Sequence, residues 1–332
     1  MPPTTPPNNK PIASLSLDMD NKWTYQRTHG DAGWKNYPSY LHILVPRVLD
    51  FLRARNLTIT FFVVGKDATF SYNQEPLQQL ARSNHEIGNH SFMHEQWLHL
   101  YSRQQIDDDL ARAEEEIERA TGRRSRGFRG PGFSLSAATL DVLSSRGYLY
   151  DASTFPTYLG PLARTYYFMT AKLTPEEKEQ RKKLFGTLKD GLRPNKAYRW
   201  QLETNPLIEI PVTTMPVAKI PVHVSYILYL SRYSTVLALT YFKMALAMCK
   251  LTGTELSLLL HPLDFLGCDD ETELSFFPAM NLPSEKKLRV VSEVLRLLTD
   301  RFTVVPMREH AQIIAGRKSA ALIRPQFDTG HI

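Results

Sequence analysis

The sequence predicts an α/β fold in which parallel strands form a sheet or barrel with helices packed around it. Short apolar runs typical of buried strands alternate along the chain with segments of helical periodicity. Unusual polar residues also follow directly after several of these runs. Because sites in parallel α/β proteins are built at the carboxyl ends of the strands, these residues are expected to meet in one site.

The first half of the chain supplies the clearest elements. The segment 102–122 is strongly amphipathic and ends in Gly122, which is typical of a helix with a glycine stop. The run 57–65 is short, aromatic and β-branched, as expected of a buried strand. By the same criteria, helices are predicted at 40–56, 75–84 and 136–147, and strands at 12–17, 85–91 and 148–154, with a strand-to-loop junction at 125–133.

The alternation of strands and helices is interrupted at residues 160–205, which are rich in charged residues and contain several Pro and Gly. We interpret this segment as an insertion that covers the barrel. Beyond it, strands are predicted at 206–216, 255–267 and 303–307, and helices at 225–251 and 284–302. A single catalytic domain is therefore expected at 12–312, with a disordered tail at 1–11 and a C-terminal tail at 313–332.

The composition is that of an ordinary globular enzyme. The 332 residues are 42% hydrophobic and 22% charged, and the net charge of +6 does not single out an anionic partner. Two cysteines without a CxxC spacing do not form a disulfide framework. No signal peptide is recognisable at the start, so a cytoplasmic protein is expected.

The apolar stretch 225–251 has two interpretations. Arg232 and Lys243 interrupt it, so it is not predicted to be a transmembrane helix. It can form one or two core helices. Alternatively, it can form an amphipathic surface that docks on a bilayer, with the two basic side chains reaching the lipid headgroups.

Two acids and two histidines form the strongest candidate site. Asp18 and Asp20 follow the first strand, and residues two apart in a strand point to the same side. His90 and His94 are four apart, so both imidazoles face one way if a helical turn begins there. Two imidazoles and one carboxylate are ligands that suit Zn²⁺.

Other catalytic patterns are absent from the sequence. The run "HEIGNH" does not have HExxH spacing, and "GFSLS" lacks the closing Gly of GxSxG. No phosphate-binding glycine motif is present either. The basic segment 123–130 is short and has little aromatic interleaving, so no nucleic-acid partner is expected.

Five segments in order along the chain resemble the motifs of the polysaccharide deacetylase family (carbohydrate esterase family 4, the NodB-homology domain). They are "SLDMD" (16–20), "HSFMH" (90–94), "RGPGF" (129–133), "DASTF" (151–155) and "LLLHP" (258–262). The resemblance spans about residues 12–307. It implies a distorted (β/α)7-type barrel, with 160–205 inserted after the fourth motif, and a divalent metal at its C-terminal face.

The resemblance also implies a role for each matching residue. The expected metal is Zn²⁺, with Co²⁺, Ni²⁺ or Mn²⁺ as alternatives, held by Asp20, His90 and His94. The expected catalytic residues are Asp18 as general base, Arg129 as its partner, the Gly132 N–H at the oxyanion, His261 as general acid and Asp151 tuning it. The first motif reads Asp-Met-Asp rather than Asp-Asp, which leaves the division of roles between its two acids open.

The segment 21–40 after the acid pair is predicted to be a loop rich in aromatic and basic residues. Aromatic faces stack on sugars, and basic groups pair with anionic groups. The candidate substrate contacts are Trp23, Tyr25, Arg27, Trp34 and, from the third motif, Phe133. The alternative is that these aromatics pack onto the rim of the barrel.

The resemblance implies a metal-dependent hydrolase that removes an N-acetyl group from an amino sugar. Its expected partner is a glycan or a lipid-linked sugar, with peripheral membrane contact on the cytoplasmic face. Two alternatives stay open: a deformylase or other amide or imide hydrolase of the same fold, and a catalytically inactive glycan-binding protein. The oligomeric state is not predicted.

Overall fold

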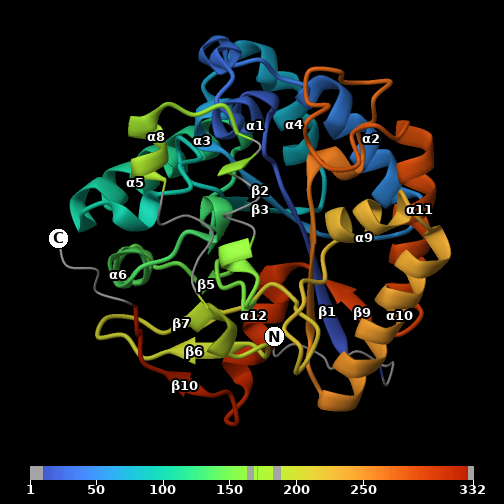
Figure 1. Ribbon diagram of the computed structural model, residues 1–332. Coiled ribbons are helices and arrows are strands. Elements are labelled where there is room, and N and C mark those ends of the chain that lie inside the picture. The colour runs from blue at the N-terminus through green and yellow to red at the C-terminus, as the bar shows by residue number, and fades with distance from the viewer. Residues whose placement is uncertain (1–9, 163–167, 170, 182–187, 328–332) are drawn as a thin grey trace.

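One curled sheet organises the protein (Figure 1). The computed structural model describes residues 10–162, 168–169, 171–181 and 188–327. Within them the strand order is β10-β6-β7-β5-β4-β3-β2-β1-β8, with β9 also pairing with β1, and only β6 and β7 pair antiparallel. The strands are β1 (Ile12–Asp18), β2 (Thr60–Val63), β3 (Glu86–Asn89), β4 (Gly127–Phe128), β5 (Tyr150–Asp151), β6 (Tyr198–Trp200), β7 (Leu207–Glu209), β8 (Leu256–Leu260), β9 (Thr303–Val305) and β10 (Leu322–Ile323).

Helices follow most strands, and the predicted α/β barrel-like fold is confirmed as a curled half-barrel. Helix α5 begins at Ser102, whose side chain forms a capping box with Gln105, and ends at Gly122 in the left-handed conformation. The helices are α1 (Lys22–His29), α2 (Leu41–Arg53), α3 (Gly65–Ala68), α4 (Gln74–Arg82), α5 (Arg103–Thr121), α6 (Ala137–Ser145), α8 (Pro175–Gln180), α9 (Val224–Ser231), α10 (Thr235–Thr252), α11 (Ser284–Thr299) and α12 (Met307–Gly316).

The two faces of the sheet bury different side chains. Alternate residues of β1 and β2, such as Leu17 and Phe61, join the main apolar core with α2, α4, α9, α10 and α11. On the other face, Met307 and Ile314 of α12 pack with Phe62 in a smaller core. Helix α12 therefore lies inside the curl, against the face from which the polar residues of the strand ends project.

A buried carboxylate fixes the start of α12. Glu86 on β3 accepts hydrogen bonds from Thr60 Oγ1 at 2.6 Å, Tyr150 OH at 3.0 Å and the backbone N–H of Arg308 at 2.8 Å. Burial raises the pKa of Glu86, whereas these donors act against the rise. Glu86 thereby holds Thr60 of β2, Tyr150 of β5 and the start of α12 together.

Three segments differ from the sequence expectations. The predicted loop 21–40 opens with helix α1, capped by the side chain of Asn21. The end of the predicted insertion 160–205 enters the sheet as β6, and Leu322–Ile323 of the predicted C-terminal tail form β10 beside it. The expectations for 1–9, 163–167, 170, 182–187 and 328–332 lie outside the described residues.

A buried lysine holds the chain that follows β8. Lys287 of α11 donates to the carbonyls of Leu263 and Leu266, each at 2.8 Å. Burial lowers the pKa of Lys287 to about 8. The short turn after His261 is thus anchored to α11 by an ammonium group.

We predict that Lys287→Met lowers the free energy of unfolding by about 2 kcal/mol, because two buried carbonyls lose their donor while the apolar stem is kept. Urea unfolding measures this loss. The matched control is Lys286→Met on the same helix, whose side chain is only half-buried, with an expected change within about 0.5 kcal/mol. Equal stability of the two variants would contradict the anchoring role.

Candidate active site

The sheet register brings the predicted site residues to one end of the strands. Leu17 of β1 is paired with Leu260 of β8. The residues that follow them, Asp18 and His261, therefore lie at the same end of the sheet. The N–H of His90 donates to Val63 at 2.9 Å, and that of Arg129 donates to Asn89 at 3.1 Å. Segments 16–20, 90–94, 129–133 and 258–262 therefore converge at the carboxyl edge of the sheet.

Asp20, His90 and His94 form a group that could hold a metal ion, with ligand atoms all within 4.8 Å of one another. Asp20 Oδ1 lies 2.8 Å from His94 Nε2 and 3.2 Å from His90 Nε2. His90 Nδ1 lies 2.6 Å from the carbonyl oxygen of Arg129, to which it must donate. This bond fixes the tautomer and turns the Nε2 lone pair of His90 toward Asp20.

The turn between the two histidines is not helical, so that prediction is wrong. Ser91 and His94 both have positive φ, at 62° and 51°. The N–H of Ser91 donates to Asn89 Oδ1 at 2.8 Å, and the N–H of His94 donates to Ser91 Oγ at 3.1 Å. Local side-chain bonds replace the helix ladder here and still bring the two imidazole rings to a centroid distance of 5.0 Å.

Electrostatics favour an ionised carboxylate in this group. Burial by itself raises the pKa of Asp20, but His94 and His90 outweigh that effect and hold the pKa well below its ordinary value. Asp20 thus offers an anionic oxygen beside two imidazole nitrogens. This N₂O donor set fits Zn²⁺.

Asp18 and Arg129 lie beside this group as a buried charge pair. Arg129 Nη1 is 3.5 Å from Asp18 Oδ1, and Nη2 donates to Ser16 Oγ at 3.2 Å. The guanidinium also stacks over Phe62, 4.9 Å from the ring centre. Asp18 Oδ1 is buried and faces Arg129 Nη1 in this ion pair, so the guanidinium fixes the position of the carboxylate.

His261 is linked to an acid that the sequence analysis missed. Its Nδ1 lies 3.2 Å from Ser225 Oγ, and Ser225 donates to Asp264 Oδ1 at 2.8 Å. Since Ser225 has one proton to give, Nδ1 of His261 is the donor to Ser225. The sequence "HPLD" contains a signal for this acid, because Asp264 comes three residues after His261. Its carboxylate accepts the backbone N–H of His261 at 2.8 Å.

Asp151 has other partners, which contradicts its predicted role beside His261. Ser153 Oγ donates to Asp151 at 2.6 Å, and Glu209 on the neighbouring β7 shares a hydrogen bond with it. Burial raises the pKa of Glu209 well above its usual value, and the charge of Asp151 adds to the rise. The side chain of His261 is instead linked to Ser225 and Asp264, and no hydrogen bond or ion pair of the described residues joins it to Asp151.

Aromatic rings link the third and fifth motifs. Phe133 contacts Phe155 at a centroid distance of 4.6 Å, Phe155 lies 6.1 Å from His223, and His223 lies 5.8 Å from His261. Burial lowers the pKa of His223 well below its usual value, and His261 adds to this, so His223 is neutral. Sequence reasoning gave no signal for His223, which precedes α9 outside every motif.

Glycine is required in the third motif by both conformation and space. Gly132 has a φ of +58°, and a Cβ there would lie 3.0 Å from Gln96 Cγ. Gly132 lies in a turn between Pro131 and Phe133, and a side chain at this position would strain the backbone of the turn.

The candidate substrate contacts on α1 and in the turn that follows it have different surroundings. Trp23 is fully buried and donates to Asp67 at 2.9 Å, which contradicts its predicted contact with substrate. Arg27 is bonded to Glu95 at 2.6 Å and stacks over Trp34, so both are engaged with the protein. Tyr25 is also buried, and its ring packs edge-on against Phe277 at a centroid distance of 5.1 Å.

The Tyr25 hydroxyl is buried and without a hydrogen-bond partner. Burial raises its pKa well above the ordinary value, and the charges of Asp20, Asp264 and Asp18 raise it further. Tyr25 therefore carries a neutral phenol near these three acids.

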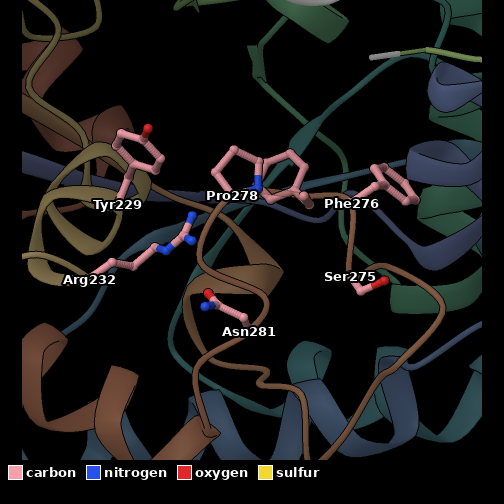
Figure 2. Close-up of a pocket in the computed structure, with 7 residues that line it drawn as sticks. Tyr229, Arg232, Ser275, Phe276, Pro278 and Asn281 are labelled. Atoms are coloured by element: carbon pink, nitrogen blue, oxygen red, sulfur yellow. The ribbon is translucent and has the colours of Figure 1, made fainter.

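Two cavities lie next to each other at the edge of this region. The larger, of about 630 Å³, is lined by α1 and the turn after it, including His29 and Asp31. The smaller, of about 190 Å³, is lined by Tyr229, Arg232 and Asn281 (Figure 2). Ser275 and Phe276 line both, so the cavities adjoin each other along the 275–281 segment.

Residues 31–150 match the family model for polysaccharide deacetylase. This part of the chain is similar to the polysaccharide deacetylase family. The matched range contains His90, His94, Arg129 and Gly132. Asp18, Asp20 and His261 lie outside it and are joined to it by the sheet.

Relatives of known sequence match over shorter stretches. A peptidoglycan deacetylase of Helicobacter pylori is 30% identical over 110 residues, which cover 33% of this chain and 36% of the relative. A peptidoglycan-N-acetylmuramic acid deacetylase of Bacillus subtilis is 37% identical over 87 residues, covering 26% of this chain and 32% of the relative. The chain thus matches about a third of the length of each.

A solved structure supports the fold over the full chain. A Mycobacterium smegmatis protein assigned to the polysaccharide deacetylases superimposes with a TM-score of 0.61. It is 20% identical and covers 98% of both chains. At this identity the likeness concerns the fold of this chain and not its activity or substrate.

We predict that Glu209→Gln flattens the pH dependence of stability. Glu209 has a raised pKa in the folded protein, so the folded state binds more protons than the unfolded state above the ordinary Glu pKa. The free energy of unfolding therefore falls as pH rises from about 4.5 toward the raised value in the wild type. The variant lacks this titration and donates to Asp151 instead.

Urea unfolding between pH 5 and 8 measures this difference. The control is Glu203→Gln, an exposed acid on the segment before β7, for which the wild-type slope is expected. A Glu209→Gln variant with the wild-type slope would show that this buried acid pair does not share a proton.

Proposed function

We propose that this chain is a metal-dependent carbohydrate N-deacetylase that removes an N-acetyl group from an amino sugar of a glycan. The observation that carries the proposal is the group of Asp20, His90 and His94, with the Asp18–Arg129 pair beside it at the carboxyl ends of the strands. The family match and the names of the relatives support the reaction class.

Asp20, His90 and His94 are the proposed metal ligands. A bound Zn²⁺ or a similar divalent cation supplies Lewis-acid polarisation of the amide carbonyl and lowers the pKa of a coordinated water. The Arg129 carbonyl orients His90 for this role, and the Ser91 hydroxyl fixes the backbone of His94. These contacts hold the donors in place before the metal arrives.

Asp18 is the proposed general base. The carboxylate of Asp18 can take a proton from the attacking water, while Arg129 fixes its position through an ion pair with Oδ1 that is shielded from solvent. The water oxygen adds to the amide carbon, and the Tyr25 hydroxyl and the Gly132 N–H are the candidate donors to the developing oxyanion.

His261 is the proposed general acid. Its Nδ1–H is held by Ser225 and, through Ser225, by Asp264, so Nε2 is the atom that gives a proton to the leaving nitrogen. The C–N bond breaks, and the products are acetate and the free amine of the sugar. Asp264 thus takes the place that the sequence analysis gave to Asp151.

A lipid-linked or otherwise membrane-borne amino sugar on the cytoplasmic face is the more specific substrate we propose. It is favoured by the apolar exposure of α9 and α10 beside His261. A panel of N-acetylated and N-formylated amino sugars, free, polymeric and lipid-linked, tests this with acetate and formate release as the readout. Release of formate alone would make the protein a deformylase. Binding without release from any substrate would make it a glycan-binding protein.

We predict that Asp18→Asn lowers the rate of acetate release about 10²–10⁴-fold while the bound metal is retained, because only the proton acceptor is lost. Metal content by elemental analysis and acetate release on the best substrate of the panel measure both. The control is Asp50→Asn, an exposed acid on α2, with wild-type values expected. Unchanged turnover in Asp18→Asn would remove this residue from the role of base.

A further inference from the structure

Helix α10 carries apolar side chains on its buried side and also on its exposed side. Its buried side, including Phe242 and Leu246, packs into the main core with α9 and α11, so α10 lies along the protein. By length and composition it could cross a membrane, yet only 28% of its 18 residues are buried. Many of the remaining positions carry apolar side chains that face water.

The exposed apolar side chains form a stripe. Leu237, Met244 and Leu251 are spaced seven apart, two turns each, and are 54%, 50% and 86% exposed. The stripe is about 21 Å long at 1.5 Å per residue. Tyr229 and Tyr233 of the α9–α10 corner, with Val236, extend it toward the site end of the molecule. We call these six residues the α10 stripe.

Basic residues flank the α10 stripe and no acid interrupts it. Residues 210–254 contain no Asp or Glu. Lys243 and Lys250 are exposed and follow Val236 at the same spacing of seven, so they run parallel to the stripe. The acid near Lys243 is Glu293 of α11, which is paired with Arg296 at 3.0 Å.

Arg232 adds a positive charge at the corner between the two helices. Figure 2 shows its guanidinium directed into the small cavity between Tyr229, Pro278 and Asn281. Within the described part of the chain no acid forms a salt bridge with it, and its charge lies near the rings of Tyr229 and Tyr233. Tyrosines and basic side chains around an apolar stripe are the pattern of a helix that lies in a membrane interface.

We propose that the α9–α10 face docks on an anionic phospholipid bilayer, with the α10 stripe in the headgroup–acyl boundary and Arg232, Lys243 and Lys250 on lipid phosphates. The charges argue against a second copy as occupant, because a symmetric pairing would bring two acid-free basic faces together. Since α9 is about 12 Å long and its Ser225 bonds His261, docking holds the site one short helix from the lipid surface.

Co-sedimentation with vesicles tests the docking without any need for activity. The wild type should bind vesicles of equal phosphatidylglycerol and phosphatidylcholine, and bind pure phosphatidylcholine more weakly. Leu237→Glu with Met244→Glu should lower the partition coefficient about tenfold or more. Lys243→Gln with Lys250→Gln should lower it about 25-fold, at about fivefold for each charge near an anionic surface.

The matched control is Leu100→Glu with Leu322→Glu, two exposed leucines on other elements, and circular dichroism confirms that each variant is folded. Retained binding in the control and loss in the stripe variant support the proposal. It is overturned if the wild type does not bind, if the stripe variant binds equally, or if sedimentation shows instead a dimer that the stripe variant abolishes. Because the readout is binding, failure here leaves the proposed deacetylation untouched.

Discussion

The site is organised around one fully buried guanidinium. Arg129 faces Asp18 at 3.5 Å and bonds Ser16, while its carbonyl accepts from His90 and its N–H completes the ladder to β3. Taking a guanidinium out of water is costly, and removing one partner of such a pair leaves a buried charge uncompensated. The curl of the sheet around this pair therefore fixes together the position of Asp18, the orientation of the His90 imidazole and the junction of β3 and β4.

The sheet and most helices could be predicted from the sequence, because strand runs such as 12–17 and helices such as 102–122 carry their own periodicity and caps. Asp18, Asp20 and His261 were recognised by their place after strands. The predictions that failed concern features that tertiary contacts determine. Trp23 looks like a sugar-stacking residue in the sequence, yet its indole N–H is held by the buried Asp67. Asp264 is joined to His261 through Ser225, which lies on a helix with no motif.

The apolar segment 225–251 is compatible both with core helices and with an exposed amphipathic surface, the two interpretations of its sequence. One side of α10 supplies core residues such as Phe242, and the other exposes Leu237 and Met244. Helix α9 joins this surface to the acid end of the site through Ser225. The proposed docking of this face on lipid would bring the Ser225–His261 end of the site close to the membrane-borne amino sugar that we propose as substrate.

The central claim is that the strand ends place two imidazoles and one carboxylate around a single metal ion. X-ray absorption at the zinc edge of the zinc-loaded protein tests it most directly. The account predicts a first shell of nitrogen and oxygen only, with the outer-shell scattering of two imidazoles from His90 and His94. A shell containing sulfur, from Cys249 or Cys268, or one without imidazole scattering would contradict it.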